Sequence, residues 1–207
     1  MAKPTFDDVN TAIQELQERR GGSFRSRPIF YKLLTDFYDD YETVLDIGSG
    51  GGKHAEIFRH FGKEVLTCDM SERHNPDYLG NFLDISKQIP DSHFDCVWCS
   101  HVLEHTQNPG ELLKELKRIL KENGLLAITV PPMKHNIVCG HVGFWTAGLL
   151  LYNLVHVGFD CSEAIVREPP KHMYLANAKT GNNEFGDQNY DVSVLVKKRD
   201  ICWTDEK

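Results

Sequence analysis

The chain has 207 residues and a mass of 23.6 kDa, which suits one domain with a full hydrophobic core. Hydrophobic residues make up 41% of it and charged residues 26%, so the composition excludes a disordered or a fibrous protein. With 23 basic and 30 acidic residues the formal net charge is −7, and nucleic acid is therefore an unlikely partner, because nucleic-acid binders present a broad basic face.

The N-terminal residues are polar and lack the apolar run of a signal peptide. Among six cysteines only Cys96 and Cys99 are closely spaced, whereas a structural zinc site needs four ligands. We therefore expect reduced thiols, no bound metal and a cytoplasmic location. The uncharged stretch 135–159 is too rich in His, Asn and Gly for a membrane span. Its apolar residues near Trp145 are a candidate homodimer face.

Helical periodicity covers the first part of the chain. Val9, Ile13 and Leu16 lie at helical spacing before the stop signal at 21–22, and a second helix is predicted from Pro28. We expect residues 1–42 to form a helical lid or cap on a main domain formed by residues 43–207.

From residue 43 onward, strand patterns alternate with helix patterns. The expected strands are 43–47, 64–68, 81–83, 94–100, 125–130, 159–167 and 192–198. The expected helices include one that ends at Gly62, one from Pro109 to Asn123, and one near 146–157. This alternation predicts an α/β fold with a doubly wound, mostly parallel seven-stranded sheet and helices on both faces. The last two strands, with no helix between them, are expected to pair as an antiparallel hairpin at one edge.

A glycine cluster follows the first expected strand, in the sequence Asp46-Ile47-Gly48-Ser49-Gly50-Gly51-Gly52. Glycines allow a ligand to approach the backbone closely, and the next helix offers free N–H groups to an anion. A dinucleotide-binding loop needs Gly-x-Gly-x-x-Gly, but the third glycine position falls on Lys53 or Ala55. Neither register therefore fits a dinucleotide loop, and the glycines instead follow the spacing Gly48-x-Gly50-x-Gly52 after an acidic residue in the strand.

Asp46-x-Gly48-x-Gly50 resembles the first motif of class I S-adenosylmethionine-dependent methyltransferases. Further segments resemble that family in the same order over roughly residues 40–200. They are Asp69 after the second strand, Asp84-Ile85, the strand 94–100 running into His101-Val102-Leu103-Glu104-His105, and the turn at Gly124. The resemblance implies a Rossmann-like methyltransferase domain over 43–207, with S-adenosyl-L-methionine as cofactor and S-adenosyl-L-homocysteine as product.

The resemblance also implies roles for individual residues. Asp46 would attract the cationic end of the cofactor or orient the loop, and the Gly48–Gly50 backbone, including Ser49, would receive its carboxylate. Asp69 would accept both ribose hydroxyls, since a carboxylate has two acceptor oxygens. The remaining assignments are Met70, Asp84 and Ile85 at the adenine and Ser100 near the methionine moiety. Met70 could instead be a core residue and Asp84 a turn residue.

Methyl transfer is an in-line displacement at an activated sulfonium, so positioning supplies much of the rate. An oxygen acceptor often needs a base as well, and His is suited to that role near neutral pH. His101 and His141 are the candidates, although either could be a structural hydrogen-bonding residue. Together with Glu104 and His105 they could also bind a metal, as in some sugar methyltransferases of this fold. For Glu104 itself, the favoured interpretation is a solvated helix residue.

The expected reaction is methyl transfer to a small-molecule or saccharide acceptor, at an oxygen atom. The saccharide option rests on a looser resemblance of 130–132, His141 and 144–146 to methyltransferases of polysaccharide and secondary-metabolite pathways. The polar segment 168–191, with Asn177, Asn182 and Asn183, could be an acceptor flap or a solvated loop. The alternatives are a non-catalytic partner protein that binds the cofactor and a nucleotide-dependent oxidoreductase.

Overall fold

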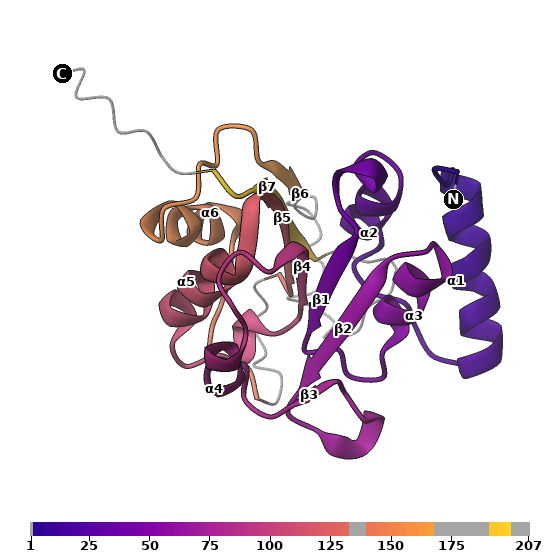
Figure 1. The fold of residues 1–207 in the computed structure, drawn as a ribbon, viewed down its shortest axis with the longest axis horizontal. Helices are drawn as coiled ribbons and strands as arrows, with labels where there is room; N and C mark the ends of the chain where they lie inside the picture. Colours follow the sequence, from indigo (N-terminus) through magenta and orange to yellow (C-terminus); the bar gives the residue numbers. More distant parts are fainter. Residues whose placement is uncertain (1, 133–139, 168–190, 200–207) are drawn as a thin grey trace, which may run out of the picture.

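The computed structural model describes residues 2–132, 140–167 and 191–199 (Figure 1). A seven-stranded sheet forms the middle layer, in the order β3-β2-β1-β4-β5-β7-β6. Its strands are β1 (Thr43–Ile47), β2 (Glu64–Asp69), β3 (Tyr78–Leu79), β4 (Phe94–Ser100), β5 (Leu120–Val130), β6 (Ile165–Arg167) and β7 (Val192–Lys197). β1 to β5 run parallel, whereas β7 pairs antiparallel with both β5 and β6, as the sequence predicted for the edge.

Helices cover both faces of the sheet, as expected for a doubly wound fold (Figure 1). On one side lie α1 (Phe6–Arg20), α2 (Arg27–Leu34) and α3 (Lys53–His60), and on the other α4 (Phe82–Ile85), α5 (Pro109–Ile119) and α6 (Ala147–His156). The buried residues form two clusters, one under each helical layer. Alternate residues of β1 divide between them, because successive strand side chains point to opposite faces. Val44 packs toward α1–α3 and Leu45 toward α4–α6.

The first helix begins where its capping residues place it. Thr5 accepts a hydrogen bond from the Asp8 backbone N–H, and the Asp8 carboxylate accepts one from the Thr5 N–H in return. Its apolar stripe, including Val9 and Leu16, is fully buried against the layer that contains α3. The segment 1–42 thus shares a core with the sheet, and its action as a lid stays a prediction.

Three expected elements differ in the structure. Residues 81–83 are not a strand: β3 lies earlier, and Asn81 caps the short helix α4 through a hydrogen bond from the Leu83 N–H (3.0 Å). The helix predicted to reach Asn123 ends at Ile119, where β5 begins. The strand expected over 159–167 is confined to Ile165–Arg167.

Within the described residues, no helix combines the length and the apolar character that crossing a membrane requires. The Cys68, Cys96 and Cys99 thiols are buried and free, and Cys161 is a free, half-buried thiol. The proposed flap with Asn177, Asn182 and Asn183 lies outside the described residues.

Candidate functional site

The glycine loop lies at the point where the strand order reverses. The chain leaves β1 toward β2 and β3 and then returns to β4, so the ends of β1 and β4 open a crevice between them. Gly48 has a φ of +67°, and a Cβ there would lie 2.3 Å from Val102 Cγ2. Gly50, with a φ of +50°, has open space around it. The loop therefore requires glycine both for its backbone angles and for its close approach to the chain after β4.

Asp69 ends β2 and holds the glycine loop from the side. Its Oδ2 accepts a hydrogen bond from the Gly50 N–H (2.8 Å), and its Oδ1 accepts one from the Ser71 N–H (2.8 Å). Each carboxylate oxygen has a second lone pair, so two acceptor positions remain for a ligand diol. Asp69 thus lies against the glycine loop with acceptor positions left over, and its role at the ribose stays a prediction.

Asp46 lies at the end of β1 and is almost completely enclosed, with a relative exposure of 1%. Its Oδ2 has no hydrogen-bond partner within the part of the chain that the structure describes. Burial raises the pKa of Asp46 to about 7, opposed by a hydrogen bond from the Ala55 backbone N–H and by the charge of Arg59. A buried acid with an unsatisfied oxygen is the kind of group that a cationic ligand or a loop N–H would satisfy.

The raised pKa of Asp46 makes its contribution to stability depend on pH. A carboxyl whose pKa rises from 3.8 to about 7 on folding binds more protons when folded, so its contribution falls as pH increases from 4 to 7. We expect Asp46→Asn to gain about 2–4 kcal/mol of unfolding free energy relative to wild type between pH 4 and pH 8. Urea unfolding at both pH values measures this difference. A difference that stays constant with pH would contradict it.

A cleft of about 690 Å³ opens along the carboxyl ends of β1, β2 and β4, within the size range of small-molecule sites. Gly48, Asp69 and Met70 line it, and their roles toward the cofactor stay predictions. Asp84 and Ile85 do not line it. The Asp84 carboxylate pairs with Lys87 on the exposed side of α4, and Ile85 packs into the core. The cleft residues to which sequence reasoning gave no role include Asn81, Phe82, Leu83 and Val102.

A second hollow, of about 220 Å³, lies on the other side of Gly48 and His101, which line both spaces. Ser49 and Ser100 line it together with Arg25 and His54. The His54 ring packs against Phe24, Phe30 and Trp98. Burial lowers the pKa of His54 to about 4, so the ring is neutral at physiological pH. Arg25 carried no motif and is brought to the site by the fold, whereas His54 lies just after the glycine cluster, in the first turn of α3.

His101 follows β4 with a φ of +57°, an unusual backbone angle for a residue other than glycine. Its Nδ1 hydrogen-bonds Glu104 Oε1 (3.0 Å), and its Nε2 lies 3.1 Å from Asp191 Oδ2. Burial lowers the pKa of His101, but the two carboxylates outweigh it and raise that pKa to about 9. Both ring nitrogens therefore face carboxylates in this arrangement.

Four hydroxyl and carboxylate side chains join the N-terminal segment to the sheet beside His101. Ser26 Oγ lies 2.8 Å from Thr129 Oγ1 and 3.0 Å from Ser100 Oγ, and it donates to Asp191 Oδ2 (3.1 Å). Ser100 is thus engaged by the protein itself, at the edge of the second hollow. This cluster fixes the loop that carries Arg25 over the ends of β4 and β5.

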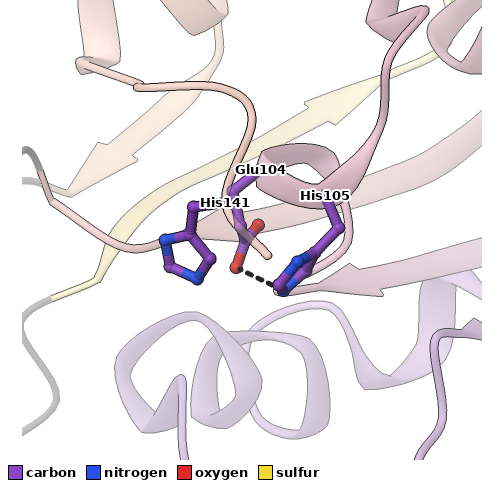
Figure 2. Close-up of side chains that lie close together, drawn as sticks. All are labelled: Glu104, His105 and His141. Carbon is purple, nitrogen blue, oxygen red and sulfur yellow. Dashed lines mark ion pairs between the residues drawn. The ribbon is translucent and has the colours of Figure 1, made fainter. Parts of the chain in front are cut away.

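The loop after β5 is held against the turn at 103–105. The Glu104 carbonyl accepts hydrogen bonds from the N–H groups of Val142 (2.8 Å) and Gly143 (3.1 Å), and His105 Nδ1 hydrogen-bonds the Gly140 carbonyl (2.9 Å). His141 is thereby placed next to His105, with ring centroids 4.8 Å apart. Figure 2 shows the Glu104 carboxylate between the two imidazole rings. Glu104 is fully buried, so its interpretation as a solvated residue is wrong.

The sheet order, the glycine loop at the β1–β4 crevice and the acid after β2 define a class I S-adenosylmethionine-dependent methyltransferase. The family model described as a methyltransferase domain matches residues 9–192, and the chain belongs to this family. This membership separates the chain from nucleotide-dependent oxidoreductases on related folds.

Individual proteins agree with this assignment. The ubiquinone biosynthesis O-methyltransferase of Glaesserella parasuis is 35% identical over 105 residues, covering 42% of this chain and 44% of that protein. The match thus spans less than half of this curated relative. A methyltransferase from Archaeoglobus fulgidus superposes with a TM-score of 0.63 at 18% identity, covering 89% of this chain and 99% of the other. A Burkholderia thailandensis N1-methyltransferase, solved with S-adenosylhomocysteine, gives 0.64 at 16% identity, covering 94% and 87%.

Proposed function

We propose that the protein transfers the methyl group of S-adenosylmethionine to an oxygen atom of a small-molecule or saccharide acceptor. The observation that carries the proposal is that the two hollows are neighbours, since both are lined by Gly48 and His101. A cofactor held by Asp69 at one end would extend past Gly48 toward His101. The acceptor would then approach from the side of His101 and His141.

The proposed roles in the cofactor cleft follow the residues that line it. Asp69 would accept the ribose hydroxyls, and Met70 would lie under the adenine beside Phe82 and Leu83. In this proposal the adenine contacts predicted for Asp84 and Ile85 are made instead by Asn81, Phe82 and Leu83 at the start of α4, which line the cleft. Arg25, in the second hollow with Ser49 and Ser100, offers a cation to the cofactor carboxylate.

The chemical step is a displacement in which the acceptor oxygen forms a bond to the methyl carbon. The carbon–sulfur bond breaks, its electron pair stays on sulfur, and the sulfonium becomes the neutral thioether of S-adenosylhomocysteine. The hydroxyl proton must leave, and of the two predicted bases we retain His141, because the carboxylates that raise the pKa of His101 to about 9 keep that ring protonated near neutral pH. Support for oxygen comes from the name of the Glaesserella parasuis relative, an O-methyltransferase, and from the imidazole of His141.

Two measurements test the proposal in sequence. Calorimetric titration with S-adenosylhomocysteine measures cofactor binding without an acceptor, and we expect a micromolar dissociation constant. Incubation with methyl-labelled S-adenosylmethionine and a panel of phenols and saccharides, with mass spectrometry, then identifies the methylated atom. The matched control is the same panel with each hydroxyl replaced by hydrogen. Binding without turnover on any acceptor would support the non-catalytic partner instead, and methylation at nitrogen or sulfur would overturn the choice of oxygen.

A further inference from the structure

We propose that Glu104, His105 and His141 bind one divalent transition-metal ion at the acceptor end of the cleft. The proposal rests on the proposed function only for the role of the ion, because the site itself is defined by its ligand atoms. One ligand atom from each of the three side chains lies within 4.8 Å of the other two. Two imidazoles and one carboxylate form the ligand set of catalytic zinc sites and of non-haem iron sites, which leave coordination positions open.

The strongest support comes from Glu104. Its side chain is fully buried, and its Oε2 has no hydrogen-bond partner among the described residues. An unpaired buried carboxylate oxygen is costly, and in native proteins it calls for a partner such as an ion. Figure 2 shows this carboxylate directed into the space between the His105 and His141 rings. A cation there would satisfy the carboxylate.

The hydrogen bonds around the cluster are those of a ligand shell. His105 Nδ1 lies 2.9 Å from the Gly140 carbonyl, which can only accept, so Nδ1 carries the proton and the lone pair is left on Nε2. That Nε2 lies 3.9 Å from Glu104 Oε1. Glu104 Oε1 is itself oriented by His101 Nδ1 (3.0 Å), which in turn contacts Asp191. Such outer partners orient the metal ligands in known sites.

The backbone also brings the ligands together. Glu104 and His105 are adjacent after β4, whereas His141 comes from the loop after β5. Three hydrogen bonds join this loop to the turn at 103–105. At Gly140, where φ is +81°, a Cβ would lie 3.3 Å from His105 Nδ1. The backbone of the loop itself therefore brings these two segments close together, so the ligand side chains do not have to span a gap between them.

His105 also lines the cofactor cleft, so the open positions of the ion would face the reacting groups. An acceptor hydroxyl bound to the ion would lose its proton to solvent more readily, because a bound cation lowers the pKa of a coordinated oxygen. That oxygen would then attack the methyl carbon as described above. In this arrangement the ion takes over the role of His141 as the group that activates the acceptor, and His141 becomes a ligand.

The test measures metal binding directly, on the untagged full chain after treatment with a chelator. We expect Zn²⁺ to bind with a stoichiometry of one in a calorimetric titration, and Co²⁺ to give a visible spectrum of nitrogen and oxygen ligands without thiolate absorption. His105→Ala should weaken Zn²⁺ binding by about 100-fold or more. Because the His105 side chain is half-exposed and that of Glu104 is fully buried, we expect His105→Ala to disturb the fold less than Glu104→Gln would. His60→Ala, on the surface of α3, is the matched control and should bind as wild type does.

Titration of the same samples with S-adenosylhomocysteine separates the two proposals. Loss of Zn²⁺ binding in His141→Ala with S-adenosylhomocysteine binding retained supports the metal site, because His141 is not among the residues that line the cofactor cleft. Equal Zn²⁺ affinity in wild type, His105→Ala and His60→Ala would overturn it, as would thiolate absorption in the Co²⁺ spectrum. Failure of wild type to bind S-adenosylhomocysteine while Zn²⁺ binding follows His105 would overturn the proposed function and leave the metal site standing.

Discussion

Asp69→Ala is expected to weaken S-adenosylhomocysteine binding by about 100-fold or more. The Asp69 carboxylate holds the Gly50 N–H at 2.8 Å and has lone pairs left for the ribose, so its removal loosens the loop and deletes the diol acceptor together. Hydrogen bonds to a charged group are each worth about 1.5–3 kcal/mol, and a loss of about 3 kcal/mol is more than a hundredfold in affinity. Calorimetric titration measures the change.

Asp91→Ala is the matched control, because Asp91 is an exposed acid whose ion pair with Arg118 lies away from the cleft residues. We expect it to bind S-adenosylhomocysteine as wild type does. Circular dichroism of both variants checks that each is folded. Equal affinities of the folded Asp69→Ala and Asp91→Ala variants would show that Asp69 does not hold the cofactor.

Gly48→Ala is expected to abolish S-adenosylhomocysteine binding and to destabilise the fold. A φ of +67° costs an L-residue about 1–2 kcal/mol, and the new Cβ would lie 2.3 Å from Val102 Cγ2. Either the loop or the segment after β4 has to move, and both line the cleft. The measurements are the unfolding free energy in urea and the calorimetric affinity.

Two further variants separate the backbone strain from the clash. In Gly48→Ala/Val102→Ala the clashing Cγ2 is gone and the Val102 Cβ lies 3.7 Å away, an ordinary contact. The double variant should therefore recover the steric part of the loss and keep the φ part. Gly110→Ala, in the first turn of α5 with open space around it, should leave stability unchanged or slightly higher. A Gly48→Ala protein as stable as Gly110→Ala would contradict the loop geometry.

Long elements with a clear apolar pattern were predictable from the sequence, and short ones were not. β3 has only two residues, too few to show the alternation of apolar and polar residues that identifies a strand. The sequence Asn81-Phe82-Leu83 predicted a strand, but in the structure Asn81 caps the helix α4. Gly124 looked like a helix stop. In the structure it lies in β5, where a Cβ would come within 2.8 Å of the Lys121 carbonyl and 3.0 Å of the Asp95 carbonyl. Gly in a strand often marks such a close backbone approach.

The site shows the same division between local and distant information. Asp46, Gly48 and Asp69 stand at strand ends next to local signals, so chain position alone indicated their placement. Arg25 reaches the site through the packing of the N-terminal segment, for which a single sequence carries no local signal. His54 lies just after the glycine cluster, but its aromatic partners Phe24, Phe30 and Trp98 come from distant parts of the chain. The partnership of His101 with Asp191 was unpredictable for the same reason, because it spans much of the chain.

The sheet order has a consequence for the synthesis of the protein. Among the strands of the described residues, β7 is synthesised last, yet it lies inside the sheet, between β5 and β6. Until it arrives, β6 has no neighbour and the wholly apolar run Leu125–Ile128 forms an unpaired edge, the kind of surface that aggregates or recruits chaperones. Asp191, which contacts His101 and Ser26, emerges with it. A nascent chain therefore carries the glycine loop well before the contacts of Asp191 with His101 and Ser26 can form.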